Sequence, residues 1–437
     1  VQLEKPVYEV PPGSQIIKVN VFAKFSNLPY YDMSQRLAFA NIQVTRPDGE
    51  IDSENLRASH GVLNYTYMIK SNSPVGEYEI SIRGTNDNDI FLEPISFKLQ
   101  VKSAEEKAVP AWVKNNAGWW AARILTNSDF SDFECSTSDT FLKLNSALAN
   151  NGFTIKVDNN TIADGIIEIL FFTTTENSFN QYRNQIIIGD NAEVKFVEKI
   201  QNLSNTTSFI NNFTQIKCGK NTNIEYNKIQ NNTENSKLID TMNIFQQEDS
   251  TCNVNTLIFG GSFTRNNLNF EQNGCNCESN MNGVSVLDNN QLADNHTFVD
   301  HKQPHCTSNE MYKGVYLGNS KGVFNGKIMV RQDAQKIDAF QSNNNLLLSE
   351  NSTIDSKPQL EIYADDVKCS HGCTIGQLDD DALFYMRSRG IAVKEAKALL
   401  TYTFASEAIE NISIPKVKIV AQKLLAKKLD VDLEFEL

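Results

Sequence analysis

The sequence predicts a mainly β protein in which an immunoglobulin-like sandwich is followed by a parallel β-helix, with α-helices at the C-terminal end. Three observations predict this order. Residues 1–102 hold short segments of alternating apolar and polar residues, residues 185–378 hold a long series of short strand-like segments with asparagine-rich turns, and helical periodicity returns only from residue 379. A chain of 437 residues is long enough for two or three domains with their own cores.

Residues 1–102 are predicted to form the sandwich. Turn signals such as "PDGE" at 47–50 separate short segments that alternate or are rich in β-branched residues. Several short strands at this spacing are typical of an immunoglobulin-like sandwich. The segments lie at 16–25, 37–45, 61–69, 76–84 and 95–101.

Residues 103–132 form a segment that contains all three tryptophans of the chain, Trp112, Trp119 and Trp120. Trp112 and Trp119 are seven residues apart, so on a helix they would share a face. Two interpretations stay open, a packing contact between domains and a recognition segment.

Residues 133–184 are predicted to lead into a β-helix that occupies residues 185–378. Its short strands alternate with polar turns, and asparagine suits such turns because it tolerates left-handed backbone. Stacked coils of this kind make a parallel β-helix. The chain shows no strict hexapeptide repeat, so an antiparallel barrel or sandwich stays an alternative for this region.

The helical region is predicted to span residues 379–437. Three aspartates at 379–381 suit a helix start, and Gly390 suits its end. The stretch 393–412 is amphipathic and Pro415 opens a last helix that ends near residue 429. The expected apolar stripe of the middle helix is Leu399, Leu400, Phe404 and Ala408.

The composition excludes several classes of function. A net charge of −13 and a pI near 5.0 argue against a general affinity for nucleic acid or anionic membranes. The sequence has no G-x-x-x-x-G-K-[ST] motif for nucleotide phosphates and no nucleophile elbow. The spacing of the eight cysteines is unlike that of a disulfide framework, which favours free thiols in a reducing compartment.

The stretch "KCSHGC" at 368–373 is the first candidate site. Cys369, His371 and Cys373 alternate with Ser370 and Gly372, so a strand would place all three side chains on one face. Thiolate and imidazole are ligands of iron and zinc, so the row suits a metal site. A catalytic thiol, a disulfide partner and a buried row without chemistry are the alternatives, and a closed zinc site would add Cys275 and Cys277.

Three histidines form a second candidate, in "DNHTFVDHKQPHC" at 294–306. Ligands spaced by four or five residues can converge across a bend and hold a metal. The alternative is a polar seam in which these side chains satisfy one another. The histidines concerned are His296, His301 and His305.

The string at 294–315, the longer string at 322–391 and the helices after it resemble the SufB/SufD core family, and within it the SufD branch. The resemblance covers about 135–437 and implies a β-helix flanked by helices. It also implies a cytoplasmic, non-enzymatic scaffold subunit for iron–sulfur cluster assembly, which pairs with a SufB-like subunit and a SufC-like ATPase. Residues 1–130 depart from the family and resemble archaeal extracytoplasmic β-domains with a Trp-rich segment.

The resemblance also assigns roles to residues. It implies that Cys369 and His371 help to build a transient iron–sulfur cluster at the interface with the SufB-like subunit, with Cys373 less certain. It implies that the ATPase docks on the helices at 381–429 and that this chain binds no nucleotide itself. The docking residues expected there are Phe384, Arg387, Arg389, Leu399 and Phe404.

One rival function comes from a different class. The predicted sandwich and the asparagine-rich coils also suit an extracytoplasmic β-solenoid that binds or cleaves polysaccharide. Such an enzyme needs charged residues grouped on one face of the solenoid. Asp365 and Asp366 are adjacent and so point to opposite faces of a strand, which speaks against a carboxylate pair there.

Overall fold

The structure is a computed structural model of the chain. The chain divides into two compact units, residues 1–129 with 151–156, and residues 130–150 with 157–437, and each unit is described by itself. The structure describes residues 2–3, 7–10, 17–23, 37–57, 63–69, 74, 76–86, 95–103, 113–114, 120–125, 139–149, 151–174, 176–203 and 206–430.

The first unit contains two sheets in its described part. A five-stranded sheet has the order β2-β8-β7-β4-β5, and a three-stranded sheet has the order β1-β3-β6. Buried side chains such as Ile42, Tyr78, Ile80 and Leu99 form the core, because strand alternation sends them to one face. Two sheets agree with the predicted sandwich, while its immunoglobulin-like character stays a prediction. The strands are β1 (Gln2–Leu3), β2 (Val7–Val10), β3 (Ile17–Ala23), β4 (Leu37–Thr45), β5 (Ile51–Arg57), β6 (Leu63–Ile69), β7 (Gly76–Asn86) and β8 (Ile95–Ser103).

The Trp-rich segment is extended where the structure describes it. Strand β9 (Val113–Lys114) pairs antiparallel with β10 (Trp120–Ile124), and β11 (Phe153–Val157) follows later in the chain. The helix considered for this segment is therefore wrong at these residues. Trp112 and Trp119 lie outside the described residues.

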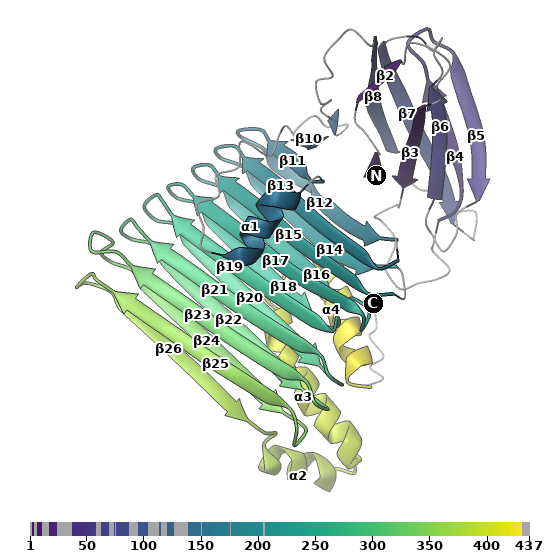
Figure 1. The fold of residues 1–437 in the computed structure, drawn as a ribbon. Helices are drawn as coiled ribbons and strands as arrows, with labels where there is room; N and C mark the ends of the chain where they lie inside the picture. Colours follow the sequence, from purple (N-terminus) through teal and green to yellow (C-terminus); the bar gives the residue numbers. More distant parts are fainter. Residues whose placement is uncertain are drawn as a thin grey trace. The chain divides into compact units, whose positions relative to one another are not determined.

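The second unit is a parallel β-helix, as the strand pattern predicted (Figure 1). Its strands alternate between two sheets, so that one sheet runs β12-β14-β16-β18-β20-β22-β24-β26 and the other contains β13-β15-β17-β19-β21-β23-β25. Ser178 lies beside Ser208, which lies beside Ser236, so one coil takes roughly 30 residues. All these pairs are parallel, which excludes the antiparallel alternative. The coils begin at Ile162, before the expected residue 185.

The strands of the β-helix have the following bounds: β12 (Ile162–Thr173), β13 (Ser178–Ile188), β14 (Glu193–Asn202), β15 (Ser208–Cys218), β16 (Asn223–Gln230), β17 (Ser236–Gln246), β18 (Thr251–Ile258), β19 (Phe263–Gln272), β20 (Glu278–Leu287), β21 (Leu292–His301), β22 (Thr307–Tyr316), β23 (Lys321–Val330), β24 (Asp338–Leu347), β25 (Thr353–Ile362) and β26 (Lys368–Gly376).

Asparagines occupy most of the left-handed turn positions between the strands of the β-helix, as expected. Asn160, Asn191 and Asn221 have φ of 57°, 56° and 52° in successive coils. The Nδ2 group of Asn191 donates to Oδ1 of Asn160, and that of Asn221 donates to Oδ1 of Asn191, both at 2.9 Å. Asparagine therefore suits these turns for two reasons: it tolerates the left-handed conformation, and its side chain forms a hydrogen bond to the asparagine at the same position of the neighbouring coil.

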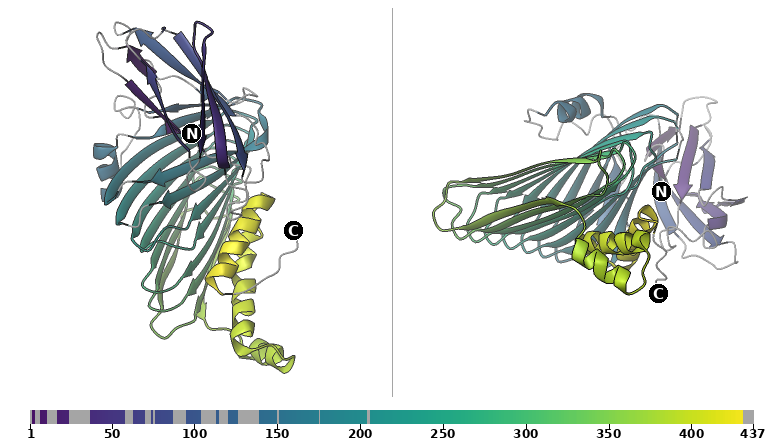
Figure 2. Two further views of the ribbon diagram at one scale, coloured as in Figure 1. Left: turned by 90° about the vertical axis from the view of Figure 1, so that its right-hand side faces the viewer. Right: turned by 90° about the horizontal axis from the view of Figure 1, so that it is seen from below.

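Helices lie on both outer faces of the β-helix (Figure 2). Helix α1 (Thr140–Leu148) packs on β13 and β15, where buried Asn145 donates to the carbonyl oxygens of Tyr182 and Asn211 at 2.9 and 3.0 Å. Helix α2 (Asp380–Ser388) leads to α3 (Val393–Ile409), which packs on β20 and β22, and α4 (Pro415–Lys428) packs on α3. Asp379 caps α2, as predicted.

The buried face of α3 differs from the expected stripe. Ala408 is buried, but Leu399, Leu400 and Phe404 are only half-buried. Apart from Ile409, the buried residues of this helix are small: they are Ala396, Thr401, Ala405, Ala408 and Ile409. Within the described part of the chain, the helices are too short or too polar to cross a membrane.

Candidate functional site

The last strand of the β-helix carries the first candidate site. Strand β26 pairs with β24, and Cys369, His371 and Cys373 lie beside Ala339, Gln341 and Asn343 in register. Residues paired laterally in a parallel sheet point to the same face. Ala339 and Gln341 are buried in the interior, so all three candidates lie on the inner face of β26, as their alternation predicted.

Cys369 is half-buried at one end of this row. It packs against an apolar cluster that includes Cys277, Cys306 and Ile337. Burial raises the pKa of the Cys369 thiol, and the nearby Asp338 carboxylate raises it further. The isolated chain therefore keeps this group as a thiol at neutral pH, and a cation brought close to it would favour the thiolate.

Cys373 lies at the other end of the row and is exposed. Its Sγ donates to Oγ of Ser356 at 3.1 Å, and Ser356 donates in turn to Oδ1 of Asn343 at 2.9 Å. Ser356 belongs to β25, so this hydrogen bond joins β26 to the other sheet at the open end of the β-helix. This hydrogen bond turns the Cys373 thiol toward the inner side of β26, although the residue is exposed.

His371 stands between the two cysteines and is exposed. Its lateral neighbour Gln341 is fully buried and donates from Nε2 to Oε2 of Glu310 at 3.0 Å. Thr297 donates to the same oxygen at 2.7 Å. Burial raises the pKa of Glu310 to about 7, against the effect of both hydrogen bonds. The hydrogen bonds of Thr297 and Gln341 to Glu310 thus form a chain that leads from the interior to the residue beside His371.

The row does not complete a metal site within this chain. In the part of the chain that the structure describes, His, Cys, Asp and Glu form no group of three or more that could hold a metal ion. The closed zinc site with Cys275 and Cys277 is therefore wrong. The Cys277 thiol donates to the carbonyl oxygens of Gln247 and Gly274, both at 3.1 Å, which accounts for its position.

The three histidines of the second candidate are not brought together. His296 lies on the outer face of β21, with Nε2 at 2.8 Å from Oδ1 of Asp294. His301 is buried on the inner face, where Nε2 lies 3.0 Å from Oγ of Ser308 and burial lowers its pKa to about 4. His305 is an exposed turn residue with φ of 62°.

The separation follows from strand geometry. His296 and His301 belong to one continuous strand and are five residues apart, and an odd separation places them on opposite faces. The convergence expected across a bend therefore does not occur. A shared metal finds no support here, and the polar-seam alternative holds only for the contact between His296 and Asp294.

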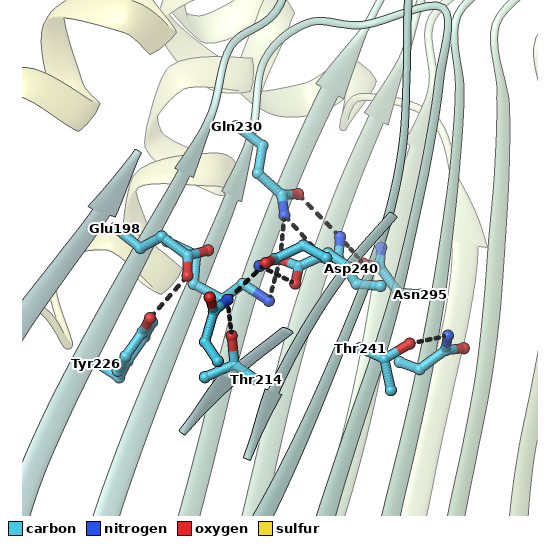
Figure 3. Close-up of polar contacts among 12 residues, drawn as sticks. Glu198, Thr214, Tyr226, Gln230, Asp240, Thr241 and Asn295 are labelled. Carbon is cyan, nitrogen blue, oxygen red and sulfur yellow. Dashed lines mark hydrogen bonds and ion pairs between the residues drawn. The ribbon is translucent and has the colours of Figure 1, made fainter. Parts of the chain in front are cut away.

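A buried polar seam inside the β-helix was not predicted from the sequence (Figure 3). Lys228 and Asp240 form an ion pair at 2.6 Å with side chains 2% and 0% exposed. Tyr226 donates to Glu198 at 2.7 Å, and burial together with the charge of Asp240 raises the pKa of Glu198 to about 7. Gln230 donates to Asp240 at 3.1 Å, so Asp240 has two partners, whereas Oε1 of Glu198 is buried without a hydrogen-bond partner in the described part of the chain.

The helical candidates divide into two groups. On α2, Phe384 is 71% exposed, and Arg387 and Arg389 are exposed beside it. Helix α2 has no buried residue at all. On α3, Leu399 and Phe404 are half-buried, and the Lys313 ammonium lies 4.4 Å from the centre of the Phe404 ring.

Comparison with protein families matches residues 171–404, more than half of the chain, to a domain described as "SUF system FeS cluster assembly, SufBD core domain". The matched residues contain most of the β-helix, the Cys369–Cys373 row, α2 and most of α3.

Individual relatives agree with this match. The iron-sulfur cluster assembly protein SufD of Escherichia coli is 33% identical over 246 residues, which cover 56% of this chain and 57% of that protein. An iron-sulfur cluster assembly SufBD family protein of Synechocystis is 30% identical over 291 residues, 64% of each chain. One of Mycobacterium leprae is 34% identical over 171 residues, 37% of this chain and 44% of its own. The chain thus spans less than two thirds of the length of each of these relatives.

Proposed function

Because this chain belongs to the SufBD core family of iron–sulfur cluster assembly proteins, we propose that it is a SufD-like scaffold subunit on which a nascent cluster is built. In this proposal it pairs with a SufB-like subunit and with a SufC-like ATPase. The cluster is cargo, assembled for transfer to other proteins. The chain itself is proposed to be non-enzymatic, with ATP hydrolysed by the partner.

The observation that carries the proposal is the position of Cys369 and His371 on the last strand of the β-helix. Both side chains lie on the inner face of β26, which is the last strand of its sheet among the described residues. Iron binds thiolate and imidazole, but a cluster needs more ligands than this row supplies. A second subunit at this open end would supply the remainder, so the site is proposed to form only at the interface.

The open end also offers the surface for such a partner. Strands β25 and β26 are the last of their sheets and leave backbone donors and acceptors on one side for a further strand. Large apolar side chains are exposed at this end of the molecule. They are Phe340, Ile362, Tyr363 and Ile375, with exposed fractions from 40% to 61%.

Helices α2 and α3 are proposed to bind the ATPase. Phe384 and Arg387 of α2, with Arg389 directly after the helix, give an exposed aromatic and cationic surface that nothing in the described part of the chain covers. Aromatic and arginine side chains are the usual anchors of protein interfaces. Leu399 and Phe404 would extend this surface along α3, although their partial burial reduces the area they can contribute.

The thiols support a reducing compartment, which we propose to be the cytoplasm. All seven cysteines in the described part of the chain are free, including the exposed Cys373. The rival function in polysaccharide binding or cleavage gains no support. The strongly perturbed carboxyl groups Glu198 and Glu310 are buried inside the β-helix, where a polymer cannot reach them.

Reconstitution of the three-subunit complex tests the proposal. The complex would be purified without oxygen, supplied with ferrous iron and sulfide, and assayed for bound cluster by visible absorption and iron content. We expect Cys369→Ser and His371→Ala to leave the complex intact and to lower cluster formation at least about tenfold, because each removes an iron ligand.

Ser370→Ala is the matched control, since Ser370 is exposed on the opposite face of the same strand. It should form cluster at the normal level. Full cluster formation by both site variants would overturn the site assignment, and failure to bind the partners would overturn the scaffold role.

A further inference from the structure

Gln341 is the buried neighbour of His371 in the sheet. Its Nε2 group is committed to Glu310, but its carbonyl oxygen Oε1 is buried and has no hydrogen-bond partner in the described part of the chain. A buried carbonyl without a donor destabilises the folded state, so native proteins normally supply one. The structure therefore contains an acceptor that lacks its donor.

The direction of the Gln341 amide indicates where that donor comes from. Gln341 belongs to β24, and its Nε2 group donates to Glu310 in register beside it on β22 of the preceding coil. Its oxygen is then left for the residue of the following coil.

The residue in that position is His371. It lies in register beside Gln341 on the same face, and its imidazole forms no hydrogen bond within the described part of the chain. Asn345 offers an informative contrast on the same strand. Its Oδ1 is also buried without a partner, but its neighbour in β26 is Ile375, which has no donor to give. Of the two positions, only that of Gln341 can be completed from β26.

We propose that Gln341 is the positioning residue of His371, accepting a hydrogen bond at Oε1 from one ring N–H so that the other ring nitrogen keeps its lone pair for iron. This deepens the proposed function and rests on it. Glu310 supports the arrangement, because its bond to Nε2 fixes which way the amide is turned. Partners of this kind set the tautomer and orientation of ligating histidines.

Nitrogen NMR of the histidine rings tests the proposal on the isolated full-length chain. The chain has five histidines, so the His371→Asn variant assigns the signals of residue 371. At about pH 8, where imidazole is neutral, one tautomer of His371 should exceed the other by about fivefold or more, the ratio that one net hydrogen bond gives. Gln341→Met removes the acceptor at nearly constant length, and should return the ratio to that of free histidine.

Two further variants keep the test decisive. Exchange of the pair, Glu310→Gln with Gln341→Glu, retains both the inner bond and the outer acceptor, and should restore the single tautomer. Gln246→Met removes an equally buried glutamine, which bonds Ser250 and Glu278, and should leave the His371 signals unchanged.

A tautomer ratio in the unaltered chain like that of free histidine would overturn the inference, as would a ratio that Gln341→Met does not move. Neither result depends on cluster formation. The role of Gln341 and the proposed function can therefore fail separately. A single His371 tautomer in a chain whose complex forms no cluster would contradict the proposed function. Cluster formation with both His371 tautomers populated would contradict the role of Gln341.

Discussion

At the scale of single residues, surroundings decide what a side chain does. The histidines of one short stretch occupy the outer face of a strand, the β-helix interior and a turn, so only their environment distinguishes their chemistry. His301 shows the effect most clearly. Burial in the interior lowers its pKa to about 4, and the nearby carboxylate of Asp300 reduces that shift only in part. The folded chain thus holds a neutral imidazole where the unfolded chain would bind a proton.

This difference predicts a pH dependence of stability. Between about pH 4 and 6.5 the unfolded chain binds a proton at residue 301 that the folded chain does not, so stability rises with pH through this window and is level above it. His301→Gln removes the titration and leaves a polar group for Ser308. On lowering the pH from about 7 to about 5, we expect the unaltered chain to lose about 2 kcal/mol more than the variant.

Urea unfolding at the two pH values measures the effect, with the variant as its own reference. The reference is needed because Glu198 and Glu310, whose pKa values are raised, change stability in the opposite direction over the same range. Parallel losses in the two proteins would show that His301 is not held neutral.

At the scale of elements, strands and turns were largely predictable, and contacts between coils were not. Alternation and asparagine-rich turns predicted the β-helix, and "KCSHGC" predicted the shared face of the row, because both depend on local geometry. The pairing of Lys228 with Asp240 depends on which coil lies beside which, and successive coils differ in length. A local pattern carries no such information.

The turns between coils give a prediction at this scale. His305 occupies a left-handed position with φ of 62°, and its N–H donates to the carbonyl of Gln335 at 2.9 Å. In the preceding coil the same place holds Asn276, whose side chain donates to Asp249 at 3.0 Å. His305→Asn should keep or raise stability by up to about 1 kcal/mol, because asparagine tolerates this backbone and can bond Asn276.

His305→Val is the opposing variant. A β-branched side chain is strained in the left-handed conformation and should cost about 1–2 kcal/mol. Urea midpoints of the three proteins compare them directly. Equal stability of the valine and asparagine variants would mean that this turn does not impose the conformation.

At the scale of the whole molecule, the chain consists of two units, and only the second matches the family. The family match begins at residue 171 and lies wholly in the second unit, which also contains the Cys369–Cys373 row and the three C-terminal helices. The first unit has its own buried core, with Ile42, Ile80 and Leu99 fully covered. Each unit therefore has the packing that a separately folding domain requires.

This division predicts that residues 130–437, which keep only residues 151–156 of the first unit, carry the scaffold role. The coils bury their apolar and polar interiors against one another, and α1 and α3 pack on their outer faces from within the same part of the chain. A chain that begins at Phe130 should keep the thermal unfolding transition of the β-helix, bind the SufB-like and SufC-like partners, and form cluster at the level of the full chain. Calorimetry and the reconstitution assay measure these three properties.

A truncated chain that unfolds at markedly lower temperature would show that the first unit stabilises the β-helix. One that folds and binds but fails to form cluster would give the first unit a part in assembly, and would contradict the assignment of the function to the second unit alone.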